Sequence, residues 1–196
     1  MLLSTRLPGL QTICWMAALA AGLFAHTAQA QTVPSATRTT HALWVGGEYS
    51  NISAGFPYAS GQRLQGAGAF VDYHLTSHIG VEAEVRFLRF NSFYGETEDH
   101  YLAGPRYMAR SFGRLQPYAQ FLVGEGRIQY PFGIGSGNYL ALAPAAGANY
   151  RISSRWSLRG EYEFQFWPGS PNFVNEPAHR IAPQGFHAGV AYRLFR

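Results

Sequence analysis

The stretch RWSLRGEYEFQF, residues 155–166, alternates between apolar and polar side chains. From Trp156 to Phe166, every second residue is apolar or glycine, and the residues between them are polar or charged. A period of two predicts a β-strand with one apolar and one charged face. In a soluble sandwich the apolar face would point into a core, whereas in a membrane barrel it would point into lipid. The rest of the chain decides between these two arrangements.

Length and composition favour a single domain that does not bind nucleic acid. The chain has 196 residues with 22 glycines, 15% aromatic and 13% charged residues, and a formal net charge of +4. All 15 basic residues are arginines, and they are scattered along the chain without a basic run. A basic face for nucleic acid is therefore not expected.

The N-terminus predicts export. Residues 1–30 combine a basic start at Arg6, an apolar run at 13–25 and the small-residue site AQA at 28–30, as in a cleavable signal peptide. The apolar run is shorter than the roughly 20 residues of a spanning helix. The only cysteine, Cys14, lies in this segment, so the mature chain is expected to lack disulfides and cysteine metal ligands. A polar leader, 31–40, follows.

Strand-like stretches fill the remainder, 41–196. They are expected at about 42–50, 65–75, 79–89, 99–110, 117–127, 139–152, 156–166 and 184–195. Short connections (76–78, 111–115, 153–155) alternate with long ones rich in Gly, Pro, Asn and Ser (51–64, 90–98, 128–138, 167–183). A sandwich has no reason to place every long connection at one end, whereas an outer-membrane barrel has short periplasmic turns and longer outer loops.

Aromatic residues on the apolar face gather near the two ends of the strands. Those near the short turns are Tyr73, Tyr107, Tyr150, Trp156 and Tyr192, and those near the long loops are Tyr49, Phe87, Tyr101, Phe166 and Phe186. Two aromatic girdles around an aliphatic band are typical of a lipid-facing surface. The sequence therefore predicts an all-β protein, an eight-stranded antiparallel up-and-down transmembrane β-barrel in the cell outer membrane. In the fifth strand, either Phe121 and Val123 or Tyr118 and Leu122 face lipid.

The opposite face predicts a polar lumen with six acids and six bases. They are Glu48, Asp72, Glu82, Glu84, Glu161 and Glu163, with Arg86, Arg106, Arg110, Arg151, Arg159 and Arg193. Eight strands leave an interior just wide enough for side chains, and buried charges need partners, so a plugged, charge-paired lumen is expected.

The short turn at 76–78 also predicts the register of the neighbouring strands. It places Leu75 opposite Ile79, and Asp72 then faces Glu82 across the ladder. Two opposed carboxylates repel and call for a cation beside them. Facing partners of strands three and four are expected to sum to about 188 or 190. Arg106 is therefore expected opposite Glu82 or Glu84, within salt-bridge distance.

Several stretches resemble the small outer-membrane β-barrel proteins of the OmpA-like and OmpX-like superfamily. They are GAFVDYHLTSHIGVEAEVRF (68–87), YLAGPRYMAR (101–110), QPYAQFLVGEGR (116–127), APAAGANYRISSRWSLRGEYEF (143–164) and HAGVAYRLF (187–195). The resemblance spans about 41–196. It implies outer-membrane lipid and lipopolysaccharide as surroundings and the barrel assembly machinery as a partner in biogenesis. Such barrels commonly end on an aromatic residue, whereas here Phe195 is followed by Arg196.

No catalytic, cofactor or metal site is predicted, although three alternatives have to be weighed. Glu161 and Glu163 could form an acid–base pair, but both also fit the lumen network. Asp72, His74 and His187 could form a proton relay or a metal site, and a polar interior explains them as well.

The third alternative is an enzyme that acts on lipid A. Deacylases of this architecture carry a His-x-Ser pair on a late strand, whereas this chain has Gly189 two residues after His187. In HLT (74–76), Thr76 lies on an early strand toward the lumen. Because the nucleophile–base pair is missing, acyl transfer is not expected.

The long connections carry aromatic residues expected to be exposed, in FPY (56–58), NSFY (91–94), YPF (130–132) and WPGSPNF (167–173). Loops of such barrels carry function most often. The expected role is a structural or loop-mediated interaction or adhesion protein, with a possible extracellular partner. The alternatives are a narrow pore or small-solute channel, or a lipid-modifying enzyme.

Overall fold

A computed structural model describes residues 41–53, 63–92, 94–170 and 181–195. The expected signal peptide, the polar leader and Arg196 lie outside these residues. Within the described part of the chain, no helix is long and apolar enough to span a membrane.

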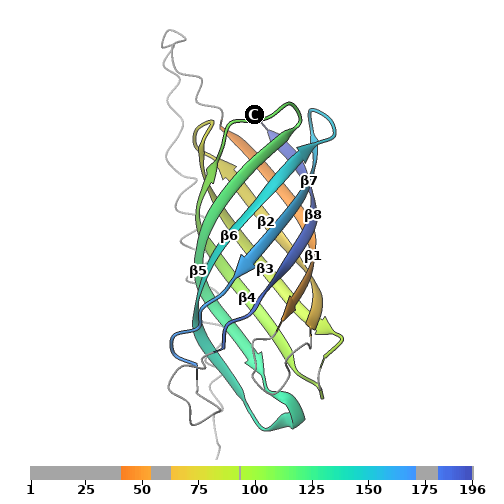
Figure 1. Ribbon diagram of the computed structural model, residues 1–196, viewed down its shortest axis with the longest axis vertical. Helices are drawn as coiled ribbons and strands as arrows, with labels where there is room; N and C mark the ends of the chain where they lie inside the picture. The colour runs from red at the N-terminus through yellow and green to blue at the C-terminus, as the bar shows by residue number, and fades with distance from the viewer. Residues whose placement is uncertain (1–40, 54–62, 93, 171–180, 196) are drawn as a thin grey trace, which may run out of the picture. The chain divides into compact units, whose positions relative to one another are not determined.

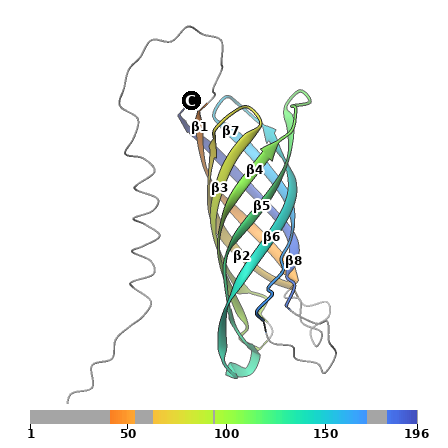
Figure 2. The same cartoon turned by 90° about the vertical axis from the view of Figure 1, so that its left-hand side faces the viewer.

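The described residues form eight strands that close into one barrel (Figures 1 and 2). The strands are β1 (Ala42–Ser53), β2 (Arg63–His74), β3 (Ile79–Phe90), β4 (Thr97–Met108), β5 (Leu115–Gln129), β6 (Ser136–Arg151), β7 (Trp156–Phe164) and β8 (Gln184–Phe195). Each strand pairs antiparallel with the next, and β8 pairs with β1. A single 3-10 turn, η2 (Pro131–Gly133), lies between β5 and β6. The predicted fold class is confirmed.

The predicted alternation of long and short connections holds only in part. The β4–β5 connection, 109–114, is as long as those at 91–96 and 130–135. Two of the long connections, 91–96 and 130–135, are shorter than expected because β4 begins at Thr97 and the hairpin of β5 and β6 continues to the pair Gln129–Ser136. We refer below to the end with 75–78, 109–114 and 152–155 as the short-turn end, and to the other as the long-loop end.

The apolar face of every strand points outward, as predicted. All ten predicted girdle residues are exposed or half-buried on this outer surface. In β5 the two alternatives are resolved, since Phe121 is 45% exposed and Val123 38%, whereas Tyr118 and Leu122 are buried. Tyr118 belongs inside because its hydroxyl accepts a hydrogen bond from Arg159 Nε at 2.8 Å.

The register of β2 and β3 is the predicted one, whereas that of β3 and β4 differs. Asp72 pairs with Glu82 in the ladder. Arg106 lies opposite Gly80 and not opposite a glutamate, so that facing residues sum to 186. Sums of 188 or 190 would place residue 89 or 91 opposite Asp99, but Phe87 is its partner. Arg106 still forms a salt bridge with Glu82, its diagonal neighbour on the lumen face, so the predicted ion pair is confirmed.

Glycines allow neighbouring strands to approach closely on the lumen face. A Cβ built at Gly124 would lie 1.9 Å from the carbonyl oxygen of Tyr101 on β4, whereas one at Gly160, on the outer face, would meet nothing within 4 Å. Glycine is therefore required at position 124 by the course of the adjacent backbone.

We expect Gly124→Ala to lower the free energy of unfolding by about 1–3 kcal/mol, since the added methyl group forces a backbone shift. Gly160→Ala is the matched control and should change it by less than about 0.5 kcal/mol. Urea unfolding of the barrel in lipid vesicles, followed by tryptophan fluorescence, measures both. Equal effects of the two substitutions would contradict the steric argument.

Candidate functional site: the charged lumen

Arg86 on β3 is the centre of the half of the lumen network that lies nearer the long-loop end. It is 0% exposed and donates from Nη1 to Glu163 Oε1 at 2.8 Å and from Nη2 to Glu163 Oε2 at 2.6 Å. Glu84 pairs with the same guanidinium, and Glu48 Oε1 lies 3.4 Å from its Nε. A planar fork that meets a carboxylate at two points fixes both side chains.

Arg159 on β7 is the centre of the other half, nearer the short-turn end. Its Nη2 donates to Glu82 Oε1 at 2.6 Å and to Glu161 Oε2 at 2.9 Å. Arg106 pairs with Glu82 as well, and its Nη1 lies 3.3 Å from Asp72 Oδ2. His74, at the short-turn end of β2, lies with Nε2 3.1 Å from that same Asp72 oxygen.

Each half of the network contains an ion pair that joins β3 to β7 across the lumen, and the arginine comes from β3 in one pair and from β7 in the other. Strands β3 and β7 are separated by three strands on either side of the closed barrel. Arg86 of β3 binds Glu163 of β7, and Arg159 of β7 binds Glu82 of β3. These reciprocal cross-lumen pairs therefore hold the walls at a fixed distance.

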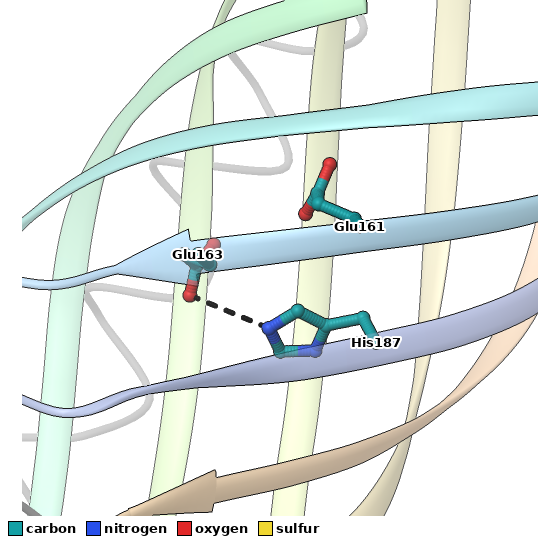
Figure 3. Close-up of side chains that lie close together, drawn as sticks. All are labelled: Glu161, Glu163 and His187. Atoms are coloured by element: carbon teal, nitrogen blue, oxygen red, sulfur yellow. Dashed lines mark ion pairs between the residues drawn. The ribbon is translucent and has the colours of Figure 1, made fainter.

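Glu161, Glu163 and His187 lie where the two halves meet (Figure 3). One oxygen of each carboxylate and one ring nitrogen all lie within 4.8 Å of one another, which is close enough for a metal ion. However, Arg86 Nη1 donates to Glu163 Oε1 and lies 3.1 Å from His187 Nε2. A cation at this position would have to displace a guanidinium that already neutralises the cluster.

Both buried histidines have their ring nitrogens in use. Because Arg86 donates to His187 Nε2, the proton of His187 resides on Nδ1, which donates to Ser50 Oγ at 2.8 Å. His100 accepts from Gln165 Nε2 at Nδ1, 3.1 Å away, and donates from Nε2 to Glu98 Oε2 at 3.2 Å. The geometry therefore assigns a neutral imidazole to both residues.

An apolar cluster that sequence reasoning missed lies at the long-loop end of the barrel interior. It comprises Leu102, Leu122, Ile128, Tyr130, Ala141, Ala143, Trp167 and Ile181. Trp167 is 0% exposed, and its indole fills the space beside Gly126, where a Cβ would lie 2.4 Å from the ring. Trp167 Nε1 donates to Gln165 Oε1 at 2.7 Å, which joins the cluster to the charged network. Trp167 and Tyr130 are thus not exposed loop aromatics, contrary to the prediction for YPF and WPGSPNF.

The structure brings together nine of the twelve predicted network residues. Arg110 is exposed because β4 ends at Met108, and Arg151 is exposed as the last residue of β6. Arg193 is half-buried, with its guanidinium 5.6 Å from the centre of the Trp44 ring. Glu98 was missed because the fourth strand was expected to begin at 99. His100 lies within that expected strand and was not assigned to the network, although its alternation with Leu102 was a usable signal.

The expected balance of six acids and six bases does not hold for the described residues. Among them, the buried acids are Glu48, Asp72, Glu82, Glu84, Glu96, Glu98, Glu161 and Glu163, and the buried arginines are Arg86, Arg106 and Arg159. With eight carboxyl groups for three guanidinium groups, each arginine is shared by two or more acids. Loss of one arginine therefore affects several carboxylates at once.

The residues weighed as a relay, a metal site or a nucleophile are divided between separate environments. Asp72 and His74 contact each other, whereas His187 contacts Ser50 and Arg86. Thr76 lies exposed in the turn and not on the lumen face. Its hydroxyl accepts hydrogen bonds from the backbone amides of residues 78 and 79, at 3.2 and 2.9 Å.

Comparisons with known proteins agree with this architecture. The sequence model of the outer membrane protein beta-barrel domain matches residues 16–193. Neisserial surface protein A is a similar solved structure, with a TM-score of 0.56 at 13% identity over 77% of this chain and 95% of that one. The β-barrel domain of Pseudomonas aeruginosa OprF has a TM-score of 0.53 at 13% identity, over 77% and 97%.

Ail, the attachment invasion locus protein of Yersinia pestis, is similar with a TM-score of 0.50 at 14% identity, over 78% of this chain and 97% of that one. A search of the curated proteins gives no match. At these identities the structural likeness shows the fold alone.

Arg106→Ala should lower the free energy of unfolding by about 3–5 kcal/mol, because it leaves Asp72 and Glu82 buried without this partner. Arg127→Ala is the matched control, since the half-exposed pair of Arg127 with Glu125 is worth less than about 1 kcal/mol. Urea unfolding in lipid vesicles compares the two. Equal losses would show that the lumen pair is no stronger than a surface pair.

A second prediction concerns Glu96, in the loop before β4. Burial raises the pKa of its carboxyl from 4.5 to about 7. The folded protein then binds this proton more tightly than the unfolded chain, so the contribution of Glu96 to stability is full below pH 4.5 and is lost as the pH rises to about 7, by at most about 1.4 kcal/mol per pH unit. Glu96→Gln should remove this slope, measured as unfolding midpoints between pH 4.5 and 8. An unchanged slope would exclude Glu96 as its source.

Proposed function

Because the chain belongs to the outer membrane protein beta-barrel domain family and resides in the cell outer membrane, we propose that it is a non-conducting surface protein that presents its outer loops to an extracellular protein partner. Its role is structural or adhesive. The outer face of the barrel contacts phospholipid and lipopolysaccharide, and the assembly machinery of the membrane handles it during biogenesis. The observation that carries this proposal is the contrast between paired charges that cross the lumen and exposed aromatic residues at the loop end.

The paired charges inside the barrel support the non-conducting part of the proposal. Arg86, Arg106 and Arg159 extend into the interior of an eight-stranded barrel, which has room for side chains and little else. The apolar cluster around Trp167 lies between these charges and the long-loop end. An ion would have to cross an apolar layer and then break paired charges, so a narrow pore is disfavoured.

Two neighbouring loops support the binding part. The rings of Tyr94 and Phe132 stack with centroids 4.3 Å apart, and the Phe132 amide donates to the Tyr94 carbonyl at 3.0 Å. Tyr94 is 64% exposed, Phe132 65% and Ile134 71%. We call these three residues the loop patch. Aromatic side chains held in fixed positions suit recognition of a protein surface.

An enzymatic role is not part of the proposal. Acyl transfer needs a nucleophile within hydrogen-bond reach of a base. His74 contacts Asp72, and the Thr76 hydroxyl accepts from turn amides. The name of Ail, the attachment invasion locus protein, is compatible with an adhesive role, although that likeness concerns the fold, and the argument rests on the loop patch.

The test replaces the loop patch by Tyr94→Ser, Phe132→Ser and Ile134→Ser together. Cells that display the wild-type barrel should attach to surfaces coated with extracellular-matrix proteins about tenfold better than cells without it, and the triple variant should lose most of this gain. Phe112→Ser is the matched control, since Phe112 is 70% exposed at the opposite end of the barrel. Planar-bilayer recordings of the purified wild type should show no sustained large currents.

Two results would refute the proposal. Sustained single-channel currents would establish a pore. Attachment that is equal with and without the barrel, or equally reduced by Phe112→Ser, would remove the adhesive role of the loop patch.

A further inference from the structure

A cavity of about 70 Å³ opens in the lumen at the short-turn end, and the proposed function gives it no role. Its lining side chains come from β1, β2 and β4 to β8, and from the β4–β5 turn. Those that matter here are Trp44, Asp72, His74, Arg106, Arg114 and Arg151. A water molecule needs about 10–15 Å³ of such space, so a compact ion of about five heavy atoms fits.

The buried part of the lining holds hydrogen-bond donors without acceptors. Arg106 is 2% exposed and uses Nη1 for its two carboxylates, whereas its Nε and Nη2 are buried without a partner among the described residues. The indole Nε1 of Trp44 is in the same situation. The Arg106 guanidinium lies 3.5 Å from the centre of the Tyr118 ring, which fixes its position. A buried donor without an acceptor destabilises the fold, so this cavity favours a ligand rich in acceptors.

The charge around the cavity selects an anion. Arg114 and Arg151 are exposed and line it together with Arg106, and Arg151 is held in place by donating from Nη2 to the Gly113 carbonyl at 3.2 Å. Asp72 is the one acidic residue among those that line the cavity, and Glu82, the second carboxylate paired with Arg106, is not part of the lining. Arginine forks match the geometry of oxyanions.

Asp72 refines the choice of anion. Its Oδ2 contacts His74 and Arg106, whereas Oδ1 is buried without a partner among the described residues. A carboxylate in an anion site repels a fully deprotonated oxyanion, but it can accept a hydrogen bond from an anion that keeps a proton. Hydrogenphosphate keeps one at neutral pH, whereas sulfate and the phosphodiester of a lipid headgroup do not.

We propose that this cavity is a binding site for hydrogenphosphate from the periplasm. Arg106, Arg114 and Arg151 donate to its unprotonated oxygens, and its hydroxyl group donates to Asp72 Oδ1. The site requires no movement of the barrel wall, because the donors that it uses already line the cavity.

The test is calorimetric titration of the folded full-length barrel in detergent with inorganic phosphate at pH 7 and 0.15 M sodium chloride. Phosphate should bind at least about tenfold more tightly than sulfate, since one hydrogen bond to a charged group separates the two anions. The double variant Arg114→Gln and Arg151→Gln should weaken phosphate binding by about tenfold or more. Both residues are exposed, and boiled and unboiled samples that migrate differently on a gel show that the variant is folded.

The matched control is Arg155→Gln, which removes an exposed arginine of the neighbouring turn that does not line the cavity. It should change phosphate affinity by less than about twofold, whereas an equal loss would show that only the general positive field of this end attracts phosphate. Equal binding of sulfate, or no phosphate binding, overturns the proposal. In nanodiscs, competition by phosphatidylglycerol but not phosphatidylcholine would show that the cavity takes a lipid headgroup and would overturn the choice of hydrogenphosphate.

Discussion

The interior of this barrel depends on two guanidinium groups that reach across it in opposite directions. Arg86 on β3 binds Glu163 on β7, and Arg159 on β7 binds Glu82 on β3. Most contacts in a barrel join neighbouring strands, and such contacts alone would tolerate a flattened cross-section. The cross-lumen pairs add a constraint along the diameter. The other buried carboxylates, the histidines and the glutamine pack around these pairs.

The alternating pattern of each strand places apolar side chains on the surface that faces lipid and charged side chains on the surface that faces the lumen. Lipid offers no partner to a charge, so charged residues of the spanning strands must face inward, where arginine and glutamate satisfy each other. Because eight strands enclose little space, long charged side chains need small neighbours, and Gly124 and Gly126 show how tightly the strands and Trp167 are fitted. An apolar outer face and a packed polar interior are thus two consequences of one geometry.

The sequence predicted the strands, the faces and most of the network because each depends on a period of two that is visible locally. It could not resolve β5, where Tyr118 and Phe121 are both aromatic and only the hydrogen bond to Arg159, 41 residues away, decides which one turns inward. It misplaced the partner of Arg106 by two or four residues because the register across an outer loop depends on the path of that loop. It overestimated the bases of the network since alternation was extended past the end of β4 to Arg110 and to the last residue of β6, Arg151. Trp167 was assigned to a loop because folding back into the lumen leaves no local pattern.

The cross-lumen pairs also determine when the interior can lose its water. Each pair joins residues 77 positions apart, so neither can form before β7 has reached the wall opposite β3. Until then, the charges of both walls stay hydrated, and a half-built sheet cannot bring them into hydrocarbon. We therefore expect closure of the cylinder and drying of its interior to be coupled to entry into the membrane.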